Sequence, residues 1–125
     1  MSALSAFVTK IIRFFTDLSE TFPEEKDIKM ALEALEGAKK INPRLILELF
    51  NEHIYKDLAE AIRTEDVHMI ITVAKKKIAT QFNEILPALS IFEKHWPTLD
   101  DENRVVIFKY LKVLVILCEK ANLKN

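Results

Sequence analysis

The chain has 125 residues, half of them hydrophobic, and its 18 basic and 19 acidic side chains leave a formal charge of −1. This length is that of one domain with a sufficient core, and the balanced charge gives no overall attraction to nucleic acid or anionic membranes. A single glycine disfavours a β-rich fold, since tight hairpin turns need glycine. We therefore expect one all-α domain over residues 1–125, a compact bundle of about five or six helices with a hydrophobic C-terminal helix.

The same composition bears on the compartment. The longest apolar run without a charge, residues 113–118, is far shorter than the about 20 residues of a membrane span. The N-terminus lacks the basic region and the cleavage site of a signal peptide. Cys118 stands alone in an apolar run, which is typical of a small buried side chain in a reducing compartment. The sequence thus predicts a soluble, intracellular protein.

Apolar periodicity places the helices of the first half. Between residues 2 and 22 apolar side chains recur at three- and four-residue steps, the spacing of one helix face, and Phe14 falls outside that stripe. Pro23 and the pair Asn42-Pro43 mark new starts, because proline fits a first helical turn. Gly37 predicts the close approach of a neighbouring element. We predict helices over residues 2–22, 24–40 and 43–54.

The second half follows the same rules. A break is expected near residues 51–53, before a short helix. Thr64 is the predicted cap of the next helix, and Thr98 with Asp101 resembles a capping box for the last one. Asn83 can cap the helix between them. The predicted helices span residues 56–62, 65–80, 83–96 and 100–121.

No arrangement of side chains predicts catalysis. His53, His68 and His95 lack the spacing of a zinc site, and one glycine cannot build a phosphate-binding loop. The acidic pairs all precede helices, where the helix dipole explains them. A buried Cys118 would be a poor nucleophile. We predict no catalytic, cofactor or metal site, and therefore a non-enzymatic protein.

The C-terminal helix carries the predicted interface. Plotted at about 100° per residue, it has one broad apolar face and a charged arc, yet four apolar residues lie within or near that arc. Either a neighbouring helix covers them or a partner binds there, in which case Phe108→Asp would abolish association and leave the fold intact. The ordinary interpretation of Trp96, Tyr55 and Tyr110 is a partly buried place in the core, and Trp96, beside Pro97, is the best candidate among them for an exposed aromatic anchor. The predicted interface residues are Val105, Phe108, Val115, Ile116 and Trp96.

These patterns leave three functional hypotheses. The first is a structural or interaction protein that acts through a protein–protein surface, with a protein partner or a second copy. The second is a nucleic-acid-associated protein that uses a basic patch, which the balanced charge disfavours. The third is a carrier of a small ligand or lipid, with a cavity among the helices over residues 2–22, 83–96 and 100–121. The patch would comprise Lys75, Lys76 and Lys77, with Lys39, Lys40 and Arg44.

Three motifs suggest an origin. They are MSxLSxF followed by FxxDLxxTFPEEKD, then KKxNPRxxLExF, and finally WxxLxxEN with KYLxVLxxLxEK. Together they resemble a group of small helical proteins of the nucleocytoplasmic large DNA viruses of algae and protists. The resemblance covers about two thirds of the chain; between residues 54 and 81 those proteins more often have an acidic, Phe-rich loop, where this chain has helical patterns. It implies a location in host cytoplasm or virion, and no activity or site residue.

Overall fold

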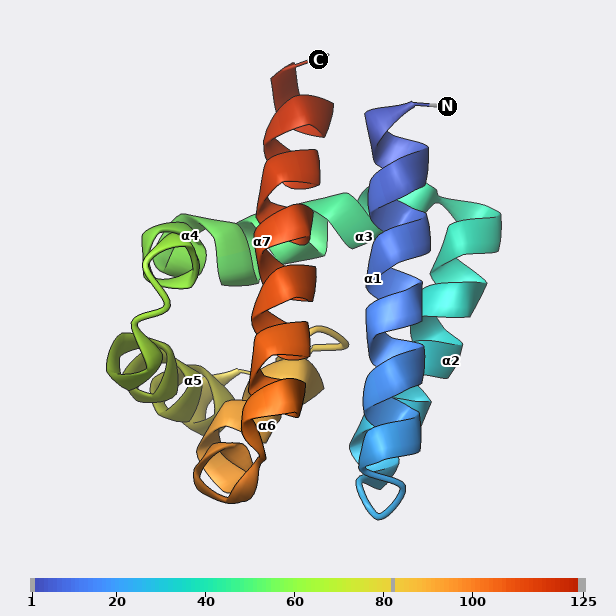
Figure 1. The fold of residues 1–125 in the computed structure, drawn as a ribbon. Helices are drawn as coiled ribbons and strands as arrows, with labels where there is room; N and C mark the ends of the chain where they lie inside the picture. The colour runs from blue at the N-terminus through green and yellow to red at the C-terminus, as the bar shows by residue number, and fades with distance from the viewer. Residues whose placement is uncertain (1, 82, 124–125) are drawn as a thin grey trace.

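Helices make up nearly all of the chain in the computed structural model, which describes residues 2–81 and 83–123 (Figure 1). These residues contain no strand, which confirms the predicted all-α fold. The α-helices are α1 (Ala3–Thr21), α2 (Lys26–Ile41), α3 (Pro43–Phe50), α4 (Lys56–Arg63), α5 (Val67–Thr80), α6 (Leu86–Lys94) and α7 (Asp101–Leu123). A π-helical turn (Asn51–Tyr55) joins α3 to α4, and a 3₁₀ turn (Trp96–Thr98) follows α6.

Aspartates begin two of these helices where the sequence predicted threonines. The carboxylate of Asp66 accepts a hydrogen bond from the backbone N–H of Met69 at 3.1 Å. Asp100 does the same for the N–H of Asn103 at 2.8 Å. Glu65 has a positive φ of 54°, so the chain turns sharply there and the next residue becomes the cap. The predicted caps at Thr64 and Thr98 were therefore each placed two residues too early.

The break predicted near residues 51–53 is the π-helical turn, and the helix continues through it. Tyr55, on this turn, donates a hydrogen bond of 2.6 Å from its hydroxyl to the carboxylate of Glu119 on α7. Arg63 at the end of α4 donates to the same carboxylate oxygen. One acidic side chain of α7 thus holds both ends of the α4 segment.

The long helices α1 and α7 lie side by side and antiparallel, and α2 lies on the other side of α1 (Figure 1). Helix α5 packs on α6. Phenylalanines from α1, α3, α6 and α7 contribute to the core, including Phe7, whose ring meets that of Phe50 edge-on at 5.1 Å. Helix α2 packs on α1, α3 and α6, and most of its residues away from the core stripe are exposed, so one side of it belongs to the outer surface of the bundle.

Candidate interaction surface

The structure separates the five residues of the predicted interface. Val105 and Ile116 are exposed on α7. Phe108, Val115 and Trp96 are buried in the core, so they do not contribute to a surface. The neighbouring helices of the same chain cover them, which is the alternative that the sequence left open. The idea that Trp96 is an exposed anchor was wrong.

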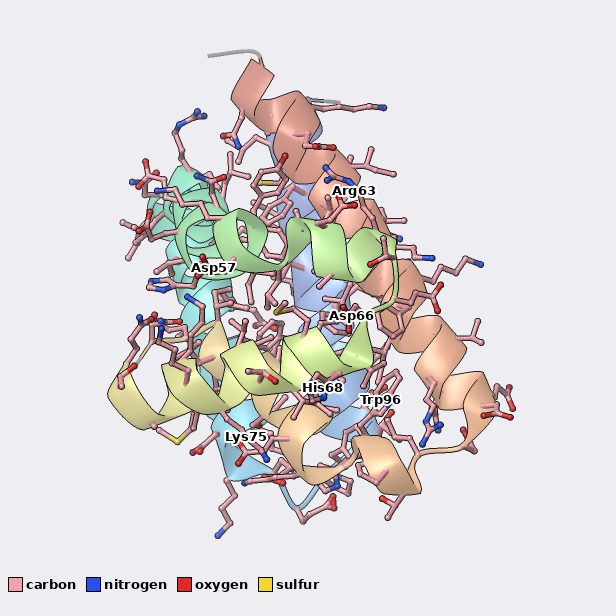
Figure 2. All side chains as sticks on the ribbon, turned by 90° about the vertical axis from the view of Figure 1, so that its left-hand side faces the viewer. Asp57, Arg63, Asp66, His68, Lys75 and Trp96 are labelled. Atoms are coloured by element: carbon pink, nitrogen blue, oxygen red, sulfur yellow. The ribbon has the colours of Figure 1, made fainter. Side chains whose placement is uncertain are left out.

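The Trp96 ring belongs to an aromatic cluster under α7. It stacks on Phe92 at 4.8 Å between centroids and meets Phe108 edge-on at 5.4 Å. The Arg104 guanidinium lies over the indole at 5.3 Å and donates to the carbonyl oxygen of Trp96 at 2.7 Å. Figure 2 shows Trp96 between α6 and α7. Because offset and edge-on pairs are the favoured aromatic geometries, this cluster stabilises the end of the bundle.

The three consecutive lysines of α5 do not form one patch. Lys75 and Lys76 are exposed, and Figure 2 shows Lys75 on the outer side of α5. Lys77 is buried, and its ammonium lies 2.7 Å from the carboxylate of Asp57 on α4. Lys77 therefore cannot belong to the basic patch of the nucleic-acid hypothesis. Its charge serves to join α4 and α5.

The metal-ligating and nucleophilic side chains among the described residues can be placed in the fold. No group of three or more His, Cys, Asp and Glu side chains there could hold a metal ion. Burial raises the pKa of the Cys118 thiol to about 11, which keeps it protonated at neutral pH. Within residues 2–81 and 83–123, no helix combines the length and the apolar character that crossing a membrane would require.

The most exposed apolar side chains lie on α2. Met30 is 67% exposed and Ile41 is 88% exposed, and Ala34 and Gly37 between them are also exposed. At about 100° per residue these four side-chain positions fall within an arc of about 60°. We call them the α2 face. It lies on the other side of the helix from the core stripe of Ile28, Ala31 and Leu35.

Gly37 is open on this face. A Cβ atom added to it would meet nothing within 4 Å, so no neighbour in this chain needs the glycine. The predicted close approach of another element of the chain was wrong. Glycine in a helix interior costs about 1 kcal/mol relative to alanine. Packing within the chain gives no reason for this cost.

A groove of about 390 Å³ adjoins the α2 face. Its size is within the range of ligand pockets, and most of its wall is apolar. A second, much smaller space of about 30 Å³ lies between α1 and α7 near Tyr110, and no residue of α6 lines it. The apolar wall of the groove is formed by Met30, Ala31 and Ala34 of α2, Ile78 of α5, and Leu86 and Pro87 of α6.

Beside the groove, Glu25 interacts with Lys94 and His95, and we call these three side chains the latch. His95 Nε2 donates to the carboxylate of Glu25 at 2.9 Å, and the Lys94 ammonium lies 3.3 Å from the same carboxylate. The His95 ring stacks on Phe22 at 4.6 Å. The hydrogen bond from His95 lowers the pKa of Glu25 below its ordinary value of 4.5, and Lys94 adds to this effect against the opposing effect of burial. The latch ties the segment before α2 to the end of α6.

We expect Glu25→Gln to lower the free energy of unfolding by about 1 kcal/mol at pH 7, since it weakens a charge-assisted hydrogen bond. A carboxyl group with a lowered pKa stabilises the fold above its unfolded-state pKa, and this contribution is lost as the pH falls through the folded-state pKa. The difference between the wild type and the variant should therefore shrink below about pH 4.5. Urea unfolding from pH 7 to pH 3 measures it, and a constant difference over that range would argue against the latch.

Comparisons of this chain with protein-family models, curated proteins and solved structures found no match. The resemblance to viral helical proteins stays a prediction from the motifs. The α2 face is not among the surfaces predicted from the sequence, although its spacing is visible there: Met30, Ala34, Gly37 and Ile41 follow steps of four, three and four residues. A second stripe on the same helix, Ile28, Ala31 and Leu35, accounts for the core and so hides this signal.

Proposed function

We propose that this protein is a non-enzymatic interaction domain that binds a protein partner through the α2 face. The observation that supports this most directly is the exposure of Met30 and Ile41 on one side of a single helix. Isolated exposed apolar residues are ordinary, but an aligned set beside a groove is typical of a helix-docking surface. The two large side chains lie about 16 Å apart along the helix axis, which is three turns.

The open glycine supports the same function. Small residues at the centre of a helix face let a second backbone approach closely, and Ala34 and Gly37 occupy that centre. In the complex, close packing against the partner would offset the helix-propensity cost of Gly37. In the isolated chain no neighbour lies close enough to do so. On α7, Val105 and Ile116 are also exposed, and they lie about as far apart along the helix axis as Met30 and Ile41 do on α2. Lys109 and Lys112 lie between them, so charged side chains interrupt that apolar stripe.

Site-specific photo-crosslinking tests the proposal. A benzophenone amino acid is placed at residue 41, on the α2 face, or at residue 105, on α7, and the purified chain is irradiated in an extract of the cells that produce it. We expect a discrete protein adduct from position 41, and its loss when Met30→Lys is added. No adduct from position 41, or equal adducts from both positions, would count against the α2 face. Mass spectrometry identifies the attached chain.

The groove favours a second candidate, a small apolar ligand held between α2, α5 and α6. Its volume of about 390 Å³ supports this candidate, and Met30 and Ala34 of the α2 face form part of its wall. Native mass spectrometry of protein purified without detergent would show a bound mass. Ala34→Trp, which fills the groove, should remove that mass. A bare chain mass for the wild type would exclude this candidate.

A further inference from the structure

We infer that the partner of the α2 face is a second copy of this chain, with the two α2 helices packed antiparallel about a two-fold axis. The inference rests on the proposed function, because it names the partner for the same surface. Two properties of α2 point to a second copy. One is the order of large and small side chains along the face, and the other is the charge on its flank.

The side-chain sizes are self-complementary. In an antiparallel pair centred between Ala34 and Gly37, each Ala34 lies opposite Gly37 of the second copy. Met30 then lies opposite Ile41 of the second copy at both ends. Small residues thus meet where the two helix axes come closest, and large exposed side chains cover each other where the axes diverge. A two-fold interface needs this kind of match of a surface with itself.

The charges fit the same register. Lys26, Glu33 and Lys40 are exposed and follow one another at seven-residue steps along one flank of the α2 face. In antiparallel helix pairs, the same flank of both helices meets. The register with small residues at its centre therefore places Glu33 beside Lys40 of the second copy, and it does so twice because of the symmetry. Neither side chain has an oppositely charged partner within 4 Å among the described residues of its own chain.

The alternative registers are opposed by like charges. A shift by seven residues in one direction would place Glu33 beside Glu33 of the second copy, and Lys26 beside Lys40. The shift in the other direction would place Lys40 beside Lys40. A parallel pair would bring the charged flank against the other flank, which carries Asp27 near its start but only Ala31 and Ala38 further along, so Glu33 and Lys40 would meet no opposite charge there. Repulsion in wrong arrangements specifies an interface as much as attraction in the right one.

A charge-swap experiment tests the pairing. Sedimentation equilibrium of the full chain at low salt, from a few micromolar to several hundred micromolar, should show a reversible dimer. Glu33→Lys or Lys40→Glu alone places like charges together twice, so each should raise the dimer dissociation constant about tenfold. The double variant restores both ion pairs with reversed sign, so its dissociation constant should return to within about threefold of the wild-type value. Circular dichroism confirms that each variant is folded.

Three results of this experiment would contradict the inference. A wild type that stays monomeric at several hundred micromolar excludes the dimer. A dimer whose dissociation constant is the same in both single variants excludes this register, as does a double variant that stays as weak as the single ones. The crosslink from residue 41 separates this failure from failure of the proposed function. An adduct with a different protein, together with a monomeric chain, would leave the α2 face as an interaction surface and exclude the second copy as its partner.

Discussion

Phe108→Asp is expected to unfold the domain. Phe108 is 5% exposed, and its ring meets Trp96 and Phe92 at centroid distances of 5.4 and 5.9 Å. Removing a buried phenylalanine costs about 3–5 kcal/mol, and a carboxylate left without a partner in an apolar core adds to that loss. Domains of this size are stable by only about 5–15 kcal/mol. Thermal unfolding followed by circular dichroism should show a melting temperature lower by roughly 15 °C or more, or no folded protein at all.

Val105→Asp is the matched control for this change. It introduces the same side chain three residues earlier on the same helix, where the native valine is 66% exposed. A surface change of this kind usually stays within about 0.5 kcal/mol of the wild type. Phe108→Asp with wild-type stability would instead restore the hypothesis drawn from the sequence, in which Phe108 belongs to an interface. A large loss in both variants would show that α7 tolerates no charge on either side.

The sequence was a good guide to where helices lie, because their signals are local. Proline, capping residues and apolar periodicity act within a few residues, and the α-helices within residues 2–81 and 83–123 begin and end close to the predicted positions. Whether a helix face is buried, in contrast, depends on segments that are far away in the sequence. Phe14 falls outside the main stripe of α1, yet it is buried because α7 brings Tyr110 to within 5.0 Å of its ring. Helix α1 packs on α2 and α7 at once, so two faces of it are buried.

The same limit explains the misplaced site. A helical plot of α7 shows apolar residues among charges, but it cannot show that Phe108 lies under α6 while Val105 faces solvent. The spacing of the α2 face can be seen in the sequence, but the exposure of Met30 cannot, since an apolar residue near a core stripe is ordinarily part of the core. Whether a helix lies at the edge of a bundle depends on packing between segments far apart in the chain. The candidate surface therefore required the fold.

The pair Lys77–Asp57 gives the second large effect, because its two members differ in burial. The Lys77 side chain is 8% exposed, whereas that of Asp57 is 51% exposed. Asp57→Ala leaves an ammonium group buried without its partner, and we expect a loss of about 2 kcal/mol in the free energy of unfolding. This is less than the cost of breaking a fully buried pair, since Asp57 is already half in water. Figure 2 shows Asp57 on α4, at the side that faces α5.

Lys77→Met should change stability by less than about 0.5 kcal/mol, because an apolar side chain of similar length fills the site and the exposed Asp57 regains its water. Adding Asp57→Ala to Lys77→Met should then cost almost nothing, so the double-mutant cycle isolates the buried charge. Urea denaturation of the wild type, both single variants and the double variant measures each step. Equal losses for the two single variants would mean that the pair is a mutual attraction of two solvated charges. A large loss for Asp57→Ala with a small one for Lys77→Met would mean that the bundle tolerates the buried lysine only because Asp57 pairs with it. The need for this pair would then help to position α5 against α4.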